Sequence, residues 1–316
     1  MALGFVFPGQ GSQTVGMSHD LAQHYPIVRQ TYNEAAEVLG YDLWSLVEEG
    51  PEAVLNQTDK TQPAMLAAAV AVWRVWREQM LPLPTVMAGH SLGEYTALSC
   101  AGALSFADAI KLVAARGRFM QEAVPSDQGA MAAILGLEDK QVIELCAYAA
   151  NGEVLAAVNF NSPGQVVVAG DKAAVNRLVA AANAAGAKRA LLLAVSVPSH
   201  CALMRPAAEK LAELLTTITI NVGSIPVIHN VSVTTACDSV AIKAALVQQL
   251  YNPVRWVESV QQIGRMGVTT LIECGPGRVL AGLNRRIDKN IETVPVYDEA
   301  TLDKARTLVE PVSASA

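Results

Sequence analysis

The sequence has no run of basic residues and few charged side chains of either sign. Lysine and arginine together number 23 against 29 aspartates and glutamates, and the formal net charge is -6. Proteins that bind DNA or RNA gather lysine and arginine on one face, because the phosphate backbone supplies much of the affinity. We therefore expect no nucleic-acid partner.

Cysteine is also scarce. The chain has five cysteines, an odd number, widely separated and without any Cys-x-x-Cys pair. A disulfide framework needs an even set, and a zinc site needs closely spaced ligand pairs, so neither is indicated. We expect reduced, mostly buried thiols in a cytosolic protein, and no metal. The five are Cys100, Cys146, Cys201, Cys237 and Cys274.

Long hydrophobic runs are missing as well. The longest apolar stretch, residues 65–73, is closed by Arg74, and it is far shorter than the roughly 20 residues that cross a bilayer. Residues 1–9 lack the charged leader and the long apolar core of a signal peptide. The expected protein is soluble and cytoplasmic, with no membrane partner.

Apolar side chains are abundant. Hydrophobic residues make up 52% and charged residues 16% of the 316 residues, which suits a large packed core. A chain of this length holds two domains, or one large domain that carries an insertion. Only the tail, residues 311–316, is expected to be disordered.

Strands and helices alternate in two parts of the chain, residues 1–127 and 197–310. Such alternation indicates an α/β domain with a parallel sheet that is covered on both faces. The two parts would form one discontinuous catalytic core. The apolar patterns predict strands at 3–7, 85–88, 226–229 and 268–272, and helices at 61–80, 106–121, 203–215 and 241–250.

Residues 128–196 follow a different pattern, which begins after a loop at 124–129. The order of elements is βαββαβ, the split βαβ arrangement of ferredoxin-like folds, and it predicts an inserted ferredoxin-like subdomain. A cleft between the insert and the core is the natural place for a site. The predicted strands are 131–137, 154–160, 165–169 and 189–195, and the helices are 138–149 and 171–184.

Residues 89–93 read Gly-His-Ser-Leu-Gly, the pattern of a nucleophile elbow. A serine on a sharp strand-to-helix turn has strained backbone angles, and glycines two positions before and after it let strand and helix approach closely. An apolar strand precedes the motif and helix-forming residues follow it. Ser91 is therefore the candidate nucleophile.

A serine hydroxyl needs a base, and His200 is the best of the five histidines because it lies where the chain re-enters the core. We expect acylation to rise with pH between about 6 and 7, where histidine usually titrates. His90, beside the serine, is the rival base, and Cys201 is the rival nucleophile. No acid between Ser91 and His200 stands out as the third member of a hydrolase triad.

The loop after the first strand contains Gly9-Gln10-Gly11 and could be mistaken for a dinucleotide-binding loop. Thr14 stands where the third glycine of that motif is needed, so this interpretation fails. The backbone N–H of Gln10 could instead join that of Leu92 as an oxyanion donor.

Two arginines lie on the helix predicted at 106–121. Arg116 and Arg118 are two positions apart, so at about 100 degrees per residue they point to opposite faces. At most one is buried. A buried guanidinium would require an anion, and its fork suits a carboxylate.

Seven ordered motifs closely resemble the malonyl-CoA:acyl carrier protein transacylases of bacterial type II fatty acid synthesis. The resemblance runs from residue 3 to about 290, and it implies an α/β-hydrolase-like core with a ferredoxin-like insert. The motifs are Phe-Pro-Gly-Gln-Gly-Ser-Gln at 7–13, Gln-Pro at 62–63, Gly-His-Ser-Leu-Gly-Glu-Tyr at 89–95, Arg-Gly at 116–117, Asn-Phe-Asn-Ser-Pro at 159–163, Pro-Ser-His at 198–200 and Gly-Pro-Gly at 275–277.

The resemblance implies a role for each candidate. Ser91 would carry the malonyl group, His200 would be its base, and Arg116 would clamp the malonyl carboxylate. Gln10 and Leu92 would form the oxyanion hole. The backbone carbonyl of Gln249 would orient the histidine, which would account for the missing acid, and Gln62, Asn159 and Asn161 would line the pocket. The substrates would be malonyl-CoA and holo acyl carrier protein, with no cofactor.

Three alternatives stay open. A discrete acyltransferase of a polyketide pathway would share this framework, although the bulky Leu92 suits a linear acyl group. A serine esterase or thioesterase would need a buried acid touching the histidine. A non-catalytic scaffold that binds carrier protein would be expected to have lost the catalytic side chains.

Carrier proteins are typically acidic, so docking would need a local basic patch. Lys188 with Arg189, and Arg285 with Arg286, are the candidates. The sequence is compatible with a monomer and does not define the oligomeric state.

Overall fold

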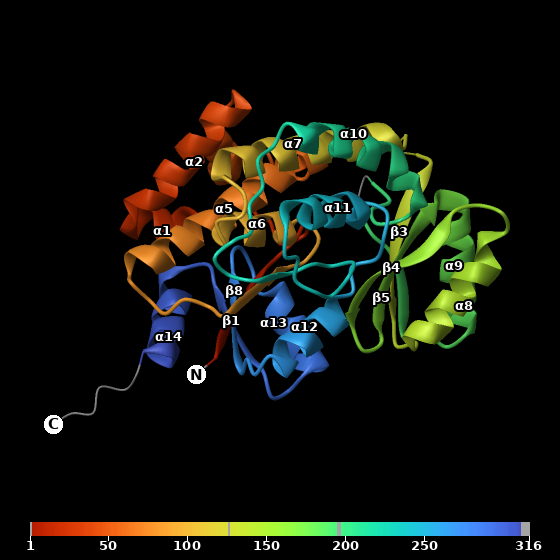
Figure 1. Ribbon diagram of the computed structural model, residues 1–316. Helices are drawn as coiled ribbons and strands as arrows, with labels where there is room; N and C mark the ends of the chain where they lie inside the picture. The colour runs from red at the N-terminus through yellow and green to blue at the C-terminus, as the bar shows by residue number, and fades with distance from the viewer. Residues whose placement is uncertain (1, 126, 195–196, 311–316) are drawn as a thin grey trace.

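The structure, a computed structural model, describes residues 2–125, 127–194 and 197–310. It contains a five-stranded parallel sheet and a four-stranded antiparallel sheet, each packed against helices (Figure 1). The mixed α/β architecture agrees with the prediction. Residues 311–316, where we expected disorder, and the predicted end of a strand at residue 195 lie outside the described residues.

The parallel sheet is buried on both faces. Its central strand alternates: Phe5 and Phe7 pack into one core, and Val6 packs into the other. All five of its residues are buried, as expected for a strand between two helical layers. In spatial order the strands are β7 (Val227–Ile228), β2 (Val86–Gly89), β1 (Leu3–Phe7), β8 (Thr270–Cys274) and β9 (Glu292–Val296).

Helices pack on the two faces unequally. The larger core lies on the side of α5 and α7, above the strands in Figure 1, and the smaller core lies on the side of α12 and α13, below them. The larger core is formed with α1 (His19–His24), α2 (Pro26–Leu39), α3 (Leu43–Glu49), α4 (Glu52–Leu55), α5 (Thr58–Glu78), α6 (Gly93–Cys100), α7 (Phe106–Ala123), the short 3-10 helix η1 (Ala202–Met204), α10 (Arg205–Thr216), α11 (Ser239–Gln249) and α14 (Glu299–Val309). The smaller core uses α12 (Trp256–Arg265) and α13 (Val279–Ile287).

The antiparallel sheet follows the expected β-α-β-β-α-β order. Its helices α8 and α9 cover one face, and Cys201 contributes to the small apolar cluster on the other. In spatial order the strands are β4 (Leu155–Ser162), β5 (Gln165–Asp171), β3 (Gly129–Leu135) and β6 (Arg189–Leu192), and the helices are α8 (Asp139–Ala150) and α9 (Lys172–Ala184).

The helices α1 to α4 and α12 to α14 and the strand β9 were not predicted from the sequence. The helices α1, α3 and α4 have 6, 7 and 4 residues, too few for the apolar pattern to repeat over the roughly 11 or more residues that reveal a helix. For α2 the signals were present, with Pro26 in the first turn and Gly40 in the left-handed conformation at the end. None of the described helices is long and apolar enough to cross a membrane.

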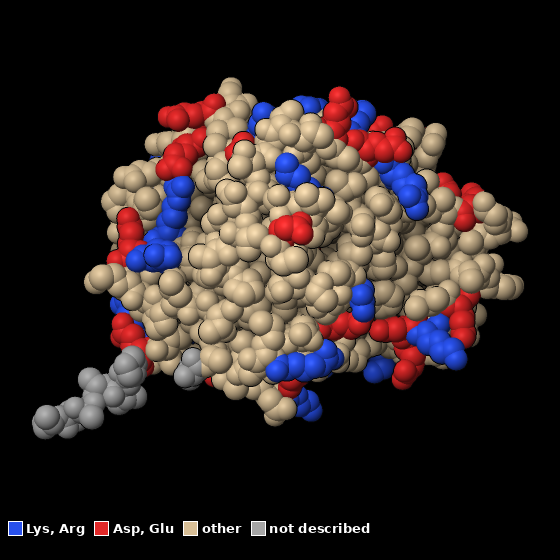
Figure 2. All heavy atoms as spheres, in the orientation of Figure 1, with Lys and Arg blue, Asp and Glu red and all other residues tan. Residues whose placement is uncertain are grey.

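Charged side chains on the face shown in Figure 2 lie mostly near its edge, with basic and acidic groups close together. Several surface pairs are within ion-pair distance, including Arg74 with Glu34 at 2.7 Å and Lys210 with Glu122 at 2.6 Å. Exposed pairs of this kind contribute little to stability.

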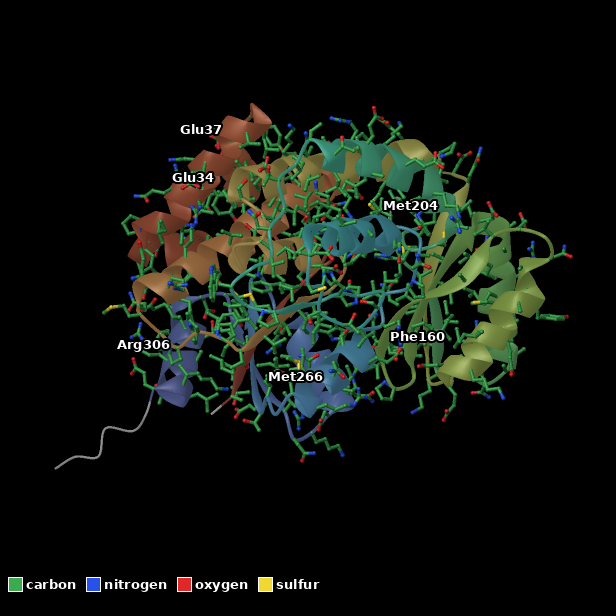
Figure 3. The ribbon with its side chains drawn as sticks, viewed as in Figure 1. Glu34, Glu37, Phe160, Met204, Met266 and Arg306 are labelled. Atoms are coloured by element: carbon green, nitrogen blue, oxygen red, sulfur yellow. The ribbon has the colours of Figure 1, made fainter. Side chains whose placement is uncertain are left out.

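The strand β4 is joined to the larger part of the molecule through Val254, in the segment that precedes α12. The backbone N–H of Phe160 donates to the carbonyl of Val254 at 3.0 Å, and the N–H of Val254 donates to Val158 at 2.9 Å. Figure 3 places Phe160 on the side of the small sheet that faces α12. This junction holds β4 beside the cleft that contains the candidate site.

Candidate active site

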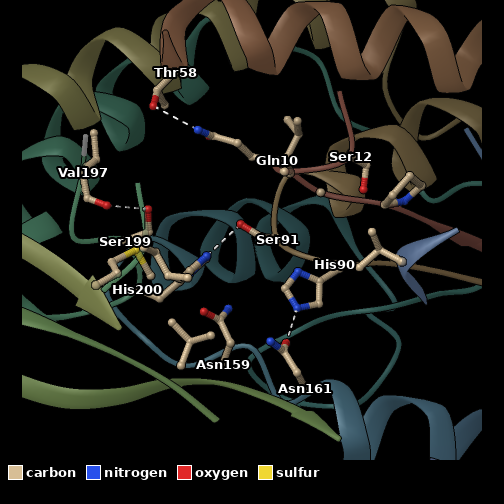
Figure 4. Close-up of a pocket in the computed structure, with 18 of the residues that line it drawn as sticks. Gln10, Ser12, Thr58, His90, Ser91, Asn159, Asn161, Val197, Ser199 and His200 are labelled. Atoms are coloured by element: carbon tan, nitrogen blue, oxygen red, sulfur yellow. Dashed lines mark hydrogen bonds between the residues drawn. The ribbon is translucent and has the colours of Figure 1, made fainter. Parts of the chain in front are cut away.

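A cavity of about 280 Å³ opens between the two sheets. The parallel-sheet part contributes the loop at 8–12, the turn after β2, and parts of α7 and α13. The antiparallel sheet contributes residues of β3, β4 and β5. Most of the candidate residues line this cavity (Figure 4): Gln10, Ser91, Leu92, Arg116, Asn159, Asn161 and His200.

Ser91 occupies a strained turn between β2 and α6. Its φ is +51°, a conformation that is uncommon for residues with a side chain. A Cβ on Gly89 would lie 1.8 Å from the backbone of Gly93, and a Cβ on Gly93 would lie 2.1 Å from the carbonyl oxygen of Phe7. Only glycine fits at either position, so the two glycines allow the elbow to form.

The hydroxyl of Ser91 and the imidazole of His200 are hydrogen-bonded. The distance between Ser91 Oγ and His200 Nε2 is 2.7 Å, and Nδ1 of His200 lies 2.7 Å from the backbone carbonyl of Gln249. A carbonyl oxygen can only accept, so Nδ1 carries the proton. Nε2 is then free to accept the proton of the serine hydroxyl, as a general base must.

Burial makes His200 a weaker base in the free protein than we expected. The side chain is 3% exposed, and burial, together with the Arg116 cation, lowers its pKa from 6.5 to about 3, while the hydrogen bond to Gln249 acts in the opposite direction. His200 is therefore neutral across the ordinary pH range. The expected rise of acylation between pH 6 and 7 is not supported for the free enzyme.

Two residues that line the cavity near the serine have backbone N–H groups that are unpaired in the described part of the chain. These are the N–H groups of Gln10 and Leu92. The Gln10 loop is held by its side-chain amide, which donates to Thr58 Oγ1 at 3.3 Å. Gly9 passes so near His90 that a Cβ would lie 2.6 Å from its carbonyl oxygen. The loop can therefore lie directly against the elbow.

Arg116 is buried in the wall of the cavity, whereas Arg118 points to solvent. Arg116 is 2% exposed and the side chain of Arg118 is 62% exposed, as their helical spacing predicted. Nη2 of Arg116 donates to Ser91 Oγ at 3.3 Å. Gly117 allows α7 to approach α5, since a Cβ there would lie 2.7 Å from the backbone of Thr58.

The guanidinium of Arg116 has no carboxylate partner among the described residues. Nη1 donates to Gln62 Oε1 at 2.8 Å and Nη2 to Gln249 Oε1 at 3.1 Å, while Nε has no described partner. Burial lowers the pKa of Arg116. Glu94 acts on this cation only from beyond Gln249. A buried cation that no described carboxylate contacts is costly, so the cavity favours an anionic ligand beside the serine.

Gln62 does not line the cavity, contrary to expectation. It is fully buried and lies behind Arg116, where it accepts from the guanidinium and donates to Met120 Sδ at 3.6 Å. The helix α5 places it there because its inner face packs against α7. Asn159 does line the cavity. Asn161 also does, and its Oδ1 lies 2.8 Å from Nε2 of His90.

The rival base, His90, and the rival nucleophile, Cys201, are less well placed for catalysis. His90 contacts Asn161, and its ring lies 5.5 Å from that of Trp256. Cys201 is buried, its thiol donates to the carbonyl of Pro198, and burial raises its pKa to about 11. A thiol that stays protonated is a poor nucleophile.

Three polar residues behind the elbow were missed from sequence. All three are buried, and His229 and Asn230 are each hydrogen-bonded to Glu94, with Nδ1 of His229 2.7 Å from Glu94 Oε1. Glu94 lies between Ser91 and His200, where no acid stood out from the sequence. Its carboxylate accepts from the side chain of Gln249, not from His200. A polar residue within the first turn of the elbow helix was the available signal.

Comparison with known proteins identifies the family. Residues 4–303 match the acyl transferase domain. The malonyl CoA-acyl carrier protein transacylase of Escherichia coli (strain K12) is 60% identical over 283 residues, which cover 90% of this chain and 92% of that protein. The corresponding protein of Salmonella typhimurium is 56% identical over 303 residues, covering 96% and 98%.

A solved structure is also similar to this chain. It contains a type II polyketide synthase acyl-carrier protein in complex with its malonyl-transacylase, with a TM-score of 0.96 and 55% identity over 98% of this chain and 100% of the other. At these identities over nearly the whole of both chains, this chain belongs to the acyl transferase domain family and, within it, to the malonyl-CoA:acyl carrier protein transacylases.

Proposed function

We propose that the protein transfers a malonyl group from malonyl-CoA to the phosphopantetheine thiol of acyl carrier protein through a malonyl-serine intermediate. The observation that carries the proposal is the position of Arg116. It is a buried cation that contacts no carboxylate in the described part of the chain, and its Nη2 lies 3.3 Å from Ser91 Oγ. A malonyl group is an acyl chain that ends in a carboxylate, so it supplies the missing anion when its thioester carbon reaches the serine.

In the first half-reaction, Nε2 of His200 takes the hydroxyl proton as Ser91 Oγ bonds to the thioester carbon. The carbonyl oxygen becomes an oxyanion, which accepts hydrogen bonds from the Gln10 and Leu92 N–H groups. Each such donor contributes about 3 to 4 kcal/mol in the transition state. The carbon–sulfur bond then breaks, and the imidazolium returns its proton to the leaving CoA sulfur. The malonyl ester on Ser91 remains.

The second half-reaction runs the same steps in reverse with a different thiol. His200 takes the proton from the phosphopantetheine sulfur, which attacks the ester carbon of the malonyl-serine. The collapsing intermediate expels Ser91 Oγ, which regains the proton from His200. A neutral carbonyl behind the histidine, in place of a carboxylate, makes it a less effective base toward water and so favours the thiol acceptor.

Arg116 also links substrate binding to the strength of the base. Its cation is one hydroxyl group away from His200 and lowers the pKa of the imidazole. A bound malonyl carboxylate would neutralise that cation and raise the pKa of His200 toward its ordinary value. The base would then be strongest in the presence of the correct substrate.

The pathway we propose is fatty acid synthesis, with a discrete acyltransferase of a polyketide pathway as the second candidate. The similarity to a malonyl-transacylase in complex with a polyketide synthase carrier protein supports keeping the latter. Both use a malonyl group, and Leu92 beside the serine suits that linear chain. Serine esterase activity is disfavoured because the buried carboxylate of Glu94, close to the elbow, bonds to Gln249, and His200 bonds to a backbone carbonyl.

The partners in this proposal are malonyl-CoA and acyl carrier protein. Lys188 with Arg189, and Arg285 with Arg286, are exposed and would meet the acidic carrier. We place the enzyme in the cytoplasm, and the proposed steps need no metal or cofactor, since protein groups perform every proton transfer.

We also propose names for the two structural parts. Residues 1–127 and 197–310 would form an α/β-hydrolase-like core, and residues 128–196 a ferredoxin-like subdomain. The spatial strand order of the small sheet, β4-β5-β3-β6, with every neighbouring pair antiparallel, supports the second name.

A single assay tests the proposed activity. The protein is incubated with malonyl-CoA, with and without holo carrier protein, and malonyl carrier protein and free malonate are both quantified. We expect rapid transfer and little malonate. Release of malonate at a rate equal to or above that of transfer would identify a thioesterase and overturn the proposal.

A further inference from the structure

Glu94 is a fully buried carboxylate that the mechanism does not use. It lies in the first turn of α6, three residues after Ser91. Oε1 faces Nδ1 of His229, and Oε2 accepts from the backbone N–H of Asn230 at 3.0 Å and from Nε2 of Gln249 at 2.8 Å. Every described group that contacts this carboxylate is thus a nitrogen atom. The nitrogens of Asn230 and Gln249 are hydrogen-bond donors.

The carboxylate, together with the backbone carbonyl of Ser91, sets the orientation of the Gln249 amide. Because a carboxylate can only accept, it selects the NH2 end of the amide and leaves Oε1 on the opposite side. That oxygen accepts from Nη2 of Arg116 at 3.1 Å. In the reverse orientation the NH2 group would face the guanidinium, and two donors would oppose each other.

The same groups hold the backbone of the elbow. Nε2 of Gln249 donates to the carbonyl oxygen of Ser91 at 2.8 Å, and Oδ1 of Asn230 accepts from the N–H of Ser91 at 2.8 Å. The amide of Asn230 donates in turn to the carbonyl of Gly89 at 2.7 Å. The strained serine is therefore fixed on both sides by the side chains of two residues that are bonded to Glu94, Gln249 through its side-chain amide and Asn230 through its backbone N–H.

We propose that Glu94 is a positioning residue for substrate selection: by orienting the Gln249 amide, it directs the Arg116 guanidinium toward Ser91 and the substrate carboxylate. This inference rests on the proposed malonyl transfer. It predicts that Glu94 influences discrimination between malonyl and acetyl groups without touching either of them.

The test is Glu94→Gln, assayed for kcat/KM with malonyl-CoA and with acetyl-CoA. The substituted amide presents an NH2 group that opposes the donors around it, so the Gln249 amide can reverse and displace Arg116. We expect the ratio of malonyl to acetyl kcat/KM to fall by about tenfold or more, the effect of losing one hydrogen bond to a charged group. The loss should appear mainly in KM for malonyl-CoA.

Gln249→Ala provides an independent test, because it removes the amide but keeps the backbone carbonyl that contacts His200. The ratio should fall by a similar factor, and the double variant should show little further loss, since both changes break one chain of contacts. If Glu94→Gln fails to fold, Gln249→Ala alone decides: an unchanged ratio overturns the proposal.

Glu273→Gln is the matched control. Glu273 is also a fully buried carboxylate, but it accepts from the N–H groups of Leu280 and Ala281 at the start of α13. Its replacement should leave the ratio unchanged. A Glu94→Gln protein that is less stable but keeps the wild-type ratio would show a merely structural role. Failure of the wild-type protein to transfer malonyl at all would instead refute the proposed function.

Discussion

The backbone carbonyl of Gln249 lies 2.7 Å from Nδ1 of His200, where a serine hydrolase has a carboxylate. The neighbouring cation gives a physical reason for this choice. Arg116 Nη2 is 3.3 Å from the hydroxyl that bonds to His200. A carboxylate at the position of the carbonyl would attract Arg116 and compete with the substrate. A neutral acceptor orients the base and leaves the guanidinium available.

Ser91 should be the residue that becomes acylated. Ser91→Ala should abolish labelling by radioactive malonyl-CoA, because the rival thiol of Cys201 is buried and its pKa is raised to about 11. Cys201→Ala is the matched control and should be labelled like the wild type. Peptide mapping of the label checks both, and a malonyl group found on any other residue would contradict the assignment.

The pH dependence of acylation should differ between the free enzyme and the substrate complex. With the pKa of His200 lowered to about 3, the base is already neutral at pH 5, so kcat/KM for acetyl-CoA should be nearly flat from about pH 5 to 8. A malonyl carboxylate would neutralise Arg116 and raise the pKa of His200. As the pH is lowered, kcat for malonyl-CoA should therefore begin to fall at a higher pH than kcat/KM for acetyl-CoA does.

Rapid-quench measurement of the acylation step gives both profiles. A tenfold rise in kcat/KM for acetyl-CoA between about pH 5.5 and 7.5 would instead show an imidazole with its ordinary pKa.

Stability should decrease with rising pH through Glu273. Burial raises the pKa of this carboxyl from 4.5 to about 7, so the folded protein binds a proton that the unfolded chain releases. Its contribution favours the fold below pH 4.5 and is lost as the pH rises through 7, by up to about 3 kcal/mol.

Urea unfolding of the wild type and of Glu273→Gln at pH 5 and 7.5 tests this. The other titrating groups contribute equally to the free energy of unfolding of the two proteins, so their effects cancel in the difference. The wild type should lose stability relative to the variant. Parallel pH dependence would show that the helix N–H groups keep the carboxyl ionised.

Local sequence patterns predicted the parts of the site that depend on local geometry. The glycines around Ser91 and the two-residue spacing of Arg116 and Arg118 each require only one turn or one helix. His200 followed from its place at the junction between two patterns, and Gln249 followed from the family resemblance alone.

The remaining features depend on contacts between distant segments. Asn230 and Gln249 meet the backbone of Ser91 from 139 and 158 residues away, so no local spacing indicates these contacts. Gln62 was wrongly expected to line the pocket. The side chain of Arg116, on α7, lies between Gln62 and the cavity, and the sequence does not reveal this packing of two helices. Glu94 was overlooked because its partners lie on segments that come together only in the fold.

We propose that Arg116 makes this enzyme selective for an acyl group that ends in a carboxylate. Arg116→Ala should lose about 2 to 5 kcal/mol of transition-state stabilisation with malonyl-CoA, the usual cost of removing one partner of a buried charge pair. Acetyl transfer, which lacks that carboxylate, should fall little. Arg118→Ala, on the exposed face of the same helix, should leave both reactions nearly unchanged.

The most direct measurement is therefore kcat/KM for malonyl-CoA and for acetyl-CoA with the wild type, Arg116→Ala and Arg118→Ala. We predict a large loss confined to malonyl-CoA in Arg116→Ala. Equal losses for the two substrates in that variant would mean that Arg116 supports the fold and does not bind the substrate carboxylate, which would contradict the account.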